Sequence, residues 1–173
     1  GDSELDTINR SQVVNALVPG RDTLTKGRDI GAALQLIASP WNRRKFLEIT
    51  VGEFNGEGAN AADKNNHKGL AARAVINPSP ALSFGVSYYD GVRRSPATVS
   101  DRVGVEGSLT YGPACLKGEY MHAMDGAVRA EGWYSQAGVF VLPKVLQAVA
   151  KYDVYDPKLN ISGDNTAVST VGV

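Results

Sequence analysis

The sequence predicts an all-β fold, an antiparallel up-and-down transmembrane β-barrel with about eight or nine strands in this chain. Three observations predict it. Apolar and polar residues alternate with a period of two over successive runs, as strands require. The connections between runs alternate between short turns and longer polar loops. Aromatic residues of the apolar faces gather toward the ends of the runs, where a membrane interface would lie.

The composition limits the function classes. A length of 173 residues, with 43% hydrophobic and 21% charged residues, fits a single folded domain over residues 1–173. The 18 basic and 18 acidic residues balance, so the net charge gives no reason to expect a nucleic-acid partner. No run of about 18 apolar residues exists, which excludes a spanning helix but leaves spanning strands allowed. We expect any export signal to have been removed or to lie outside this sequence.

Residues 67–90 give the clearest pattern, two alternating runs joined by the turn Pro78-Ser79-Pro80. Leu70 and Ile76 lie on the apolar face of the first run, and Arg73 lies on the other face. These apolar faces contain many alanine and glycine residues beside single large residues. This composition fits a wall between lipid and water better than it fits a packed core.

The remaining elements follow the same alternation. Residues 1–26 are the least regular part, where Ser11 is a candidate cap for a helical turn over 11–17 within a surface loop. The seventh run is ambiguous in the face that it presents. The predicted strands are, in order, residues 30–36, 47–52, 69–76, 82–89, 102–110, 116–121, 133–141, 146–153 and 166–173.

The connections predict two unlike ends of the sheet, as in outer-membrane barrels with short periplasmic turns and long external loops. The short turns each contain proline, at Pro40, Pro78-Ser79-Pro80, Pro113 and Pro143. The long loops follow Phe54, Asp90, Met124 and Tyr155. With the long loops outside, the expected interface aromatics are Tyr88, Tyr120, Trp133 and Tyr152 at one rim and Tyr111 and Trp41 at the other.

Several segments, taken in order, resemble a known family. They are ELDTINRSQVVNALVPGRD, RDIGAALQL, LEITVGEFNGEGAN, LAARAVINP, VGVEGSLTYG, LKGEYMHA, EGWYSQAGVFV and VLQAVAKYDVYDP. Together they resemble the middle portion of the phosphate-selective porins of the O and P type. The resemblance implies a sixteen-stranded, trimeric barrel in the outer membrane of Gram-negative bacteria, through which small hydrophilic solutes diffuse.

The resemblance also implies an inward-folded constriction loop over residues 4–28, with Arg10, Arg21 and Arg28 as candidate constriction residues. The solutes that the resemblance implies include anions such as phosphate. Family members carry arginines at alternate positions along one strand, whereas LAARAV holds only Arg73, so selectivity for phosphate does not follow. Charged residues on the polar faces are candidate pore-lining groups, because fixed charges set ion preference in a water-filled pore. They are Arg73, Arg102, Lys117, Lys151, Glu48, Glu106 and Glu119, with Asp153 on the same face.

The sequence contains no recognisable catalytic or metal-binding constellation. His67 and His122 are the only histidines, and neither has metal-ligand spacing to the single cysteine, Cys115. We therefore expect no enzymatic activity, no bound metal and no cofactor. Two other assignments stay open: a soluble β-barrel or sandwich that binds an apolar ligand, and a structural outer-membrane barrel whose interior is filled and conducts nothing.

Overall fold

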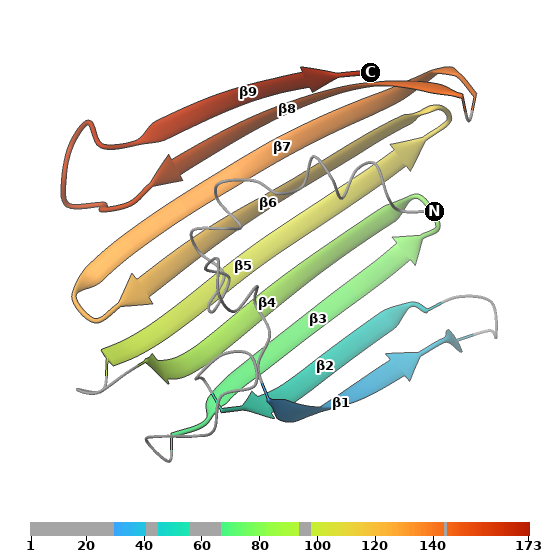
Figure 1. Cartoon of the computed structure of the whole chain (residues 1–173). Coiled ribbons are helices and arrows are strands. Elements are labelled where there is room, and N and C mark those ends of the chain that lie inside the picture. The colour runs from blue at the N-terminus through green and yellow to red at the C-terminus, as the bar shows by residue number, and fades with distance from the viewer. Residues whose placement is uncertain (1–29, 41–44, 56–66, 94–97, 144) are drawn as a thin grey trace.

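The computed structural model describes residues 30–40, 45–55, 67–93, 98–143 and 145–173, and these form one antiparallel sheet. Its nine strands are neighbours in sequence order, an up-and-down arrangement (Figure 1). The all-β prediction is confirmed. The strands are β1 (Gly31–Ala38), β2 (Leu47–Phe54), β3 (Gly69–Ser79), β4 (Leu82–Arg93), β5 (Thr98–Tyr111), β6 (Ala114–Asp125), β7 (Val128–Leu142), β8 (Leu146–Asp156) and β9 (Thr166–Gly172).

The predicted central hairpin is present as β3 and β4. Ile76 pairs with Phe84 and Ser79 pairs with Leu82, so Pro80 and Ala81 make the turn between the strands. The pairing shifts between Ile76 and Ser79, where Pro78 has no amide proton to donate to the ladder. The proline-rich segment therefore closes the hairpin at the cost of one irregularity.

Two of the predicted long loops differ from the structure: the prediction of a long loop after Met124 is wrong, and the loop after Asp90 is shorter than expected. The loop expected after Met124 is the two-residue turn Gly126-Ala127, because β6 continues to Asp125 and β7 begins at Val128. Gly126 has a φ of 61°, a conformation that glycine adopts without steric penalty. The connection expected over residues 91–100 narrows to residues 94–97. In both places the alternation of apolar residues stops at polar residues, whereas the hydrogen-bonded strands continue beyond them.

The two faces of the sheet differ in chemistry. We call the apolar one the outer face; on β4 and β5 it carries the directly paired Val86 and Val105, with Phe84 and Val103 two residues along their strands. The polar one, the inner face, carries the alternate residues. The large exposed apolar residues of the outer face on β1 to β8 include Leu34, Leu36, Val51, Leu70, Ile76, Phe84, Val86, Val103, Val105, Leu109, Leu116 and Val139.

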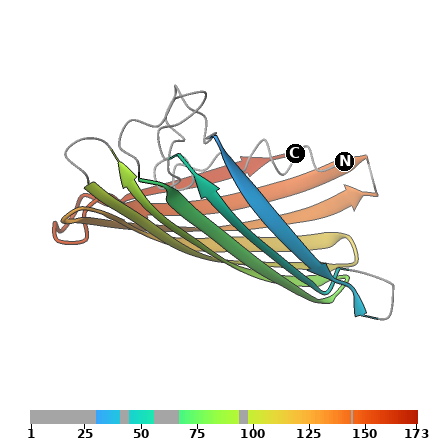
Figure 2. The same ribbon diagram turned by 90° about the horizontal axis from the view of Figure 1, so that it is seen from below.

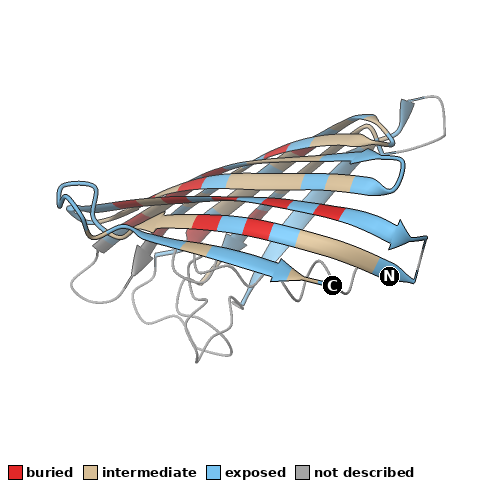
Figure 3. Cartoon of the chain, turned by 90° about the horizontal axis from the view of Figure 1, so that it is seen from above, coloured by how far each residue is buried: buried red, intermediate tan, exposed pale blue. Residues whose placement is uncertain are grey.

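Burial is inverted relative to a water-soluble sheet. Leu34 is 83% exposed and Val86 is 55% exposed, whereas Gln136 is 1% exposed and Lys151 is 5% exposed. Buried and exposed positions alternate along the central strands (Figure 3). The sheet bends into a trough (Figure 2), and side chains crowd together on the concave side of a bent sheet. We infer that the buried polar residues mark the concave side.

The buried apolar cluster is small. It consists of Met121, Ala123 and Ala130, with Tyr155 packed against it. These residues come from β6, β7 and β8 and belong to the inner face. The large aliphatic residues of the sheet contribute little to this cluster, since most of them lie on the outer face.

The sheet is open within the described part of the chain. β1 pairs with β2 and β9 pairs with β8, so each outer strand has one free edge. The same residues contain no helix that is long and apolar enough to cross a membrane. The helical turn predicted over 11–17 and the whole constriction loop predicted over 4–28 lie outside the described residues.

Candidate functional site: the polar inner face

A row of basic and neutral polar side chains crosses the inner face from β5 to β8. We call it the lysine row. Ser108 pairs with Lys117, Lys117 with Gln136, and Gln136 with Lys151. Because directly paired residues of antiparallel strands have Cβ atoms about 5 Å apart, these side chains are immediate neighbours. The row offers hydrogen-bond donors along its whole length.

A second row, the carboxylate row, runs parallel to the first and lies two residues along each strand. Glu106 pairs with Glu119, Glu119 with Tyr134, and Tyr134 with Asp153. The two rows are separated by about 7 Å, since each strand residue rises roughly 3.3 Å. The inner face therefore carries a positive band beside a negative band.

Cations and carboxylates of the inner face make ion pairs with one another. Arg73 on β3 pairs with Glu106 on β5. The Lys151 Nζ lies 3.2 Å from Asp153 Oδ2, and both side chains are buried. The same Nζ lies 5.0 Å from the centroid of the Tyr134 ring, within cation–π range. Each pair cancels charge locally, so the face has strong local fields and little net charge.

Gln136 occupies the centre of the lysine row and is almost completely buried. Neither its Nε2 nor its Oε1 has a hydrogen-bond partner among the described residues, and Asp153 Oδ1 likewise has none there. Leaving such groups unpaired costs about 1–3 kcal/mol each. The inner face therefore has unsatisfied donors and acceptors that water or a small polar solute can satisfy.

Arg102 lies on the inner face at one end of the strands and has a different role from Arg73. Its Nη2 donates to Asp125 Oδ2 at 2.7 Å, and its Nη1 donates to the carbonyl oxygens of Asp101 and Met124 at 2.8 and 3.2 Å. Its side chain is buried. Arg102 therefore ties β5 to β6 at the rim.

Glu48 lies near the opposite end of the sheet. Its Oε2 accepts a hydrogen bond from Lys45 Nζ at 3.3 Å. In the register Val75 and Gly85 separate it from Glu106, so Glu48 lies in line with the carboxylate row but three strands away from it. The candidate pore-lining residues thus all belong to the polar face, but only Arg73, Glu106, Lys117, Glu119 and Lys151 form a continuous group.

A polar pocket of about 180 Å³ opens on the inner face between the two rows. Arg73, Glu106 and Lys117 bring charges of both signs to it. Ser83 and Ser108 add hydroxyl groups. A Cβ built at Gly85 would lie 2.5 Å from Glu106 Oε1, so the glutamate side chain lies directly over a glycine. The absence of a side chain at residue 85 gives this carboxylate its position.

Of the aromatics predicted for a membrane interface, Tyr88, Tyr120, Trp133 and Tyr152 lie on the outer face near acidic residues. The Trp133 and Tyr152 rings lie 5.7 Å apart, and Tyr120 pairs with Trp133 in the register. The Tyr120 hydroxyl donates to Glu131 Oε2 at 2.7 Å. Tyr88 lies two residues from Asp90, and Tyr111 lies at the other end of β5. Trp41 is outside the described residues.

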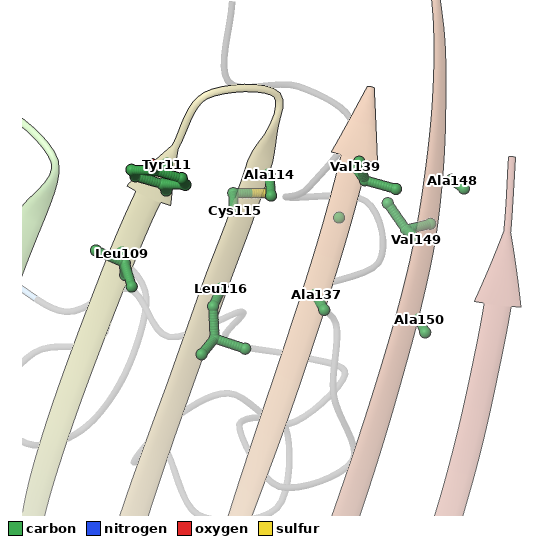
Figure 4. Close-up of a pocket in the computed structure, with 11 residues that line it drawn as sticks. Leu109, Tyr111, Ala114, Cys115, Leu116, Ala137, Val139, Ala148, Val149 and Ala150 are labelled. Atoms are coloured by element: carbon green, nitrogen blue, oxygen red, sulfur yellow. The ribbon is translucent and has the colours of Figure 1, made fainter. Parts of the chain in front are cut away.

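The outer face also has a shallow apolar groove of about 450 Å³ near the Tyr111 end of the sheet (Figure 4). Ala137 and Ala150 form its floor on β7 and β8, beside the larger Leu116 and Leu109 of β6 and β5. The small residues of β7 and β8 produce the hollow. It has no charged lining residue, which suits contact with hydrocarbon and not with a polar ligand.

Other predicted candidates have simple environments. Cys115 is a free thiol, and its Sγ lies 3.7 Å from Gln147 Nε2. Within the described ranges, no group of three His, Cys, Asp or Glu side chains could hold a metal ion. Arg10, Arg21 and Arg28 fall outside the described residues.

Sequence reasoning did not select Tyr134, Gln136, Ser83 or Ser108 as site residues. The signal was present, since each belongs to the polar set of its run. Tyr134 was not selected because Trp133 and Tyr134 are adjacent aromatics in the seventh strand, and the sequence did not decide which of them faces outward. The register places Trp133 outside with Tyr120 and places Tyr134 inside with Glu119 and Asp153.

No protein-family model, curated protein sequence or solved structure matches the chain.

Proposed function

We propose that this chain is part of the wall of an outer-membrane β-barrel channel that allows small hydrophilic solutes to diffuse passively. The observation that carries the proposal is the inverted burial of the sheet. Leucine and valine side chains are exposed on the outer face, while lysine, aspartate and glutamine are buried on the inner face. Lipid is the environment in which such an outer face is stable, and water is the environment that suits the inner face.

The dimensions of the apolar band support a membrane location. On β5 the outer face has no charged residue from Val103 to Tyr111, and Asp101 follows at one end. At roughly 3.3 Å per residue and a tilt of about 40°, this band covers about 20 Å of membrane thickness, close to the ~25 Å of outer-membrane barrels. The aromatics beside the acidic rim fit the girdle that borders such a band.

The open edges of the sheet require closure in a bilayer. Unpaired backbone groups of β1 and β9 have no water to bind in the hydrocarbon region, so an open edge there is costly. We propose that further strands, of the same polypeptide or of another copy, complete the barrel. The order of segments that resembles the phosphate-selective porins supports this proposal and a trimeric assembly.

Ion pairing on the inner face argues for a channel of weak charge preference. Arg73 and Lys151 each have a carboxylate partner, so the wall gives phosphate or another anion little net attraction. The proposed solutes are therefore small and hydrophilic, with no commitment to phosphate.

One second candidate has its own observation in favour. Gln136, Lys151 and Asp153 are nearly fully buried, as they would be in a barrel whose interior is filled. Such a protein would be a structural outer-membrane barrel without conductance. In contrast, a soluble fold with the apolar face inside has no comparable support, because those side chains are exposed.

Reconstitution in a planar lipid bilayer tests the proposal. We expect the protein to partition into detergent and to give discrete conductance steps with a small reversal potential in a KCl gradient. Insertion without steps would favour the structural barrel. A protein that stays folded and monomeric without detergent, and never conducts, would contradict a membrane location altogether.

A further inference from the structure

The pocket between the two charged rows has an unusual composition for its size. Its volume of about 180 Å³ is below the ~300–1,000 Å³ of drug-sized ligand sites, so it accepts only a small solute. Its lining contains two cations, Arg73 and Lys117, and one carboxylate, Glu106. Glu119 adds a second carboxylate nearby, since it pairs with Glu106 in the register and lies two residues from Lys117 on β6. The four charges sum to zero.

The geometry separates the two signs of charge within reach of one small molecule. Lys117 lies directly opposite Ser108, and Glu106 lies two residues along the same strand as Ser108. Such a diagonal cross-strand pair has its Cα atoms about 7–8 Å apart. A molecule between them can therefore contact an ammonium group at one end and a carboxylate at the other.

Hydrogen-bond donors lie at the Lys117 end of the pocket, and a carboxylate acceptor lies at the Glu106 end. Lys117 takes part in none of the ion pairs found among the described residues, so its ammonium group can bind a carboxylate together with the Ser83 and Ser108 hydroxyls. Arg73 engages Glu106 through Oε1, which leaves Oε2 as an acceptor for an ammonium group. A simple anion would gain at the first end and be repelled at the second.

We propose that this pocket binds small zwitterions, molecules of single-amino-acid size that carry one carboxylate and one ammonium group. The carboxylate of the solute binds Lys117 and the two serine hydroxyls, and its ammonium group binds Glu106. The inference rests on the proposed channel function, and it names the class of solute that the wall prefers.

Three solutes of nearly equal size separate zwitterion binding from binding of a single charge. They are L-alanine, the anion L-lactate and the cation of L-alaninol. In proteoliposomes containing the protein, we expect alanine to enter about fivefold faster than either of the others, the effect of roughly 1 kcal/mol that one exposed ion pair can supply. Lys117→Gln should remove the advantage of alanine over alaninol, because the solute carboxylate loses its partner, and Glu106→Gln should remove the advantage of alanine over lactate, because the solute ammonium group loses its partner.

Matched variants and a binding measurement keep the test decisive. Lys117→Arg retains the charge and should retain the preference, and Lys45→Gln removes a cation elsewhere on the sheet and should not change it. Saturation-transfer NMR on the detergent-solubilised protein reports alanine binding even if no solute is transported. Equal rates with no saturation transfer to alanine would overturn the inference and leave a channel intact. Failure of all three solutes to enter, with alanine bound, would instead overturn the channel.

Discussion

Buried charges and exposed leucines are the residue-scale property that is unusual for a sheet surrounded by water. In water, exposing Leu34 and Val86 loses the free energy that burial of an aliphatic side chain supplies, about 1.5–3 kcal/mol each. Burying Lys151 costs several kcal/mol unless it is paired, and it is paired with Asp153. The side chains are thus arranged for an apolar environment outside the sheet and a polar environment inside it.

Arg102 illustrates an inner-face charge that stabilises the fold. Replacement by Met removes the donors to Asp125, Asp101 and Met124 while nearly preserving volume. Because acceptors at a buried site lose their partner, we expect Arg102→Met to lower the free energy of unfolding by about 1–3 kcal/mol. Urea titration in lipid vesicles measures the change. Arg102→Lys should lose less, and equal stability of all three proteins would refute a tying role.

Arg73 is a charge that would set ion preference in the proposed channel. Its removal leaves Glu106 unpaired on the wall, so Arg73→Gln should move the channel toward cations. We expect a change in the anion-to-cation permeability ratio below about fivefold, since one exposed pair is worth at most ~1 kcal/mol. The reversal potential in a KCl gradient reports it. Glu106→Gln should shift the potential the opposite way; if neither variant shifts it, both residues lie outside the conducting path.

The sequence was sufficient to assign residues to faces but not to place them beside one another. The two-residue period put Arg73, Glu106, Lys117 and Lys151 on the polar face, and the register agrees. The pairing of Arg73 with Glu106 joins residues on β3 and β5, a contact that depends on the stagger of three strands. No local pattern encodes that stagger, so the mixed-charge pocket could be found only in the structure.

At the scale of elements, the strands extend beyond their apolar pattern. β6 and β7 continue the backbone ladder through Asp125, Val128 and Arg129, where the outer face becomes polar. Hydropathy therefore marked where the apolar band ends and not where the strands end. The tight turn at Gly126 was missed for this reason, although the pair Asp125-Gly126 is a favourable hairpin signal.

Adjacent residues of β6 provide a matched test of the two faces. Leu116 is exposed on the outer face and Lys117 lies on the inner face. We expect Leu116→Arg to destabilise the protein in lipid vesicles by about 2–4 kcal/mol, the cost of arginine on the lipid face near the membrane midplane. Lys117→Arg should change stability by less than about 0.5 kcal/mol. Similar effects of the two arginines would contradict the assignment of faces.

At the scale of the whole molecule, the part of the chain that the structure describes is an open nine-stranded trough, which exposes two edges and one apolar surface. In water both features favour aggregation, through edge pairing and through burial of the apolar patch. In a bilayer the outer face is covered by lipid, and closure by further strands pairs the edges. Whether the molecule aggregates therefore depends on what the outer face contacts.

Spin labels along β5 test this contact most directly. In a Cys115→Ala background, single cysteines replace the outer residues Val103, Val105 and Leu109 or the inner residues Ser108 and Thr110, and each carries a nitroxide. In vesicles we predict that the outer labels collide with oxygen dissolved in the lipid and not with an aqueous nickel chelate, while the inner labels show the opposite ratio. Outer labels that are relaxed by the nickel chelate, or are shielded from both reagents, would contradict the account.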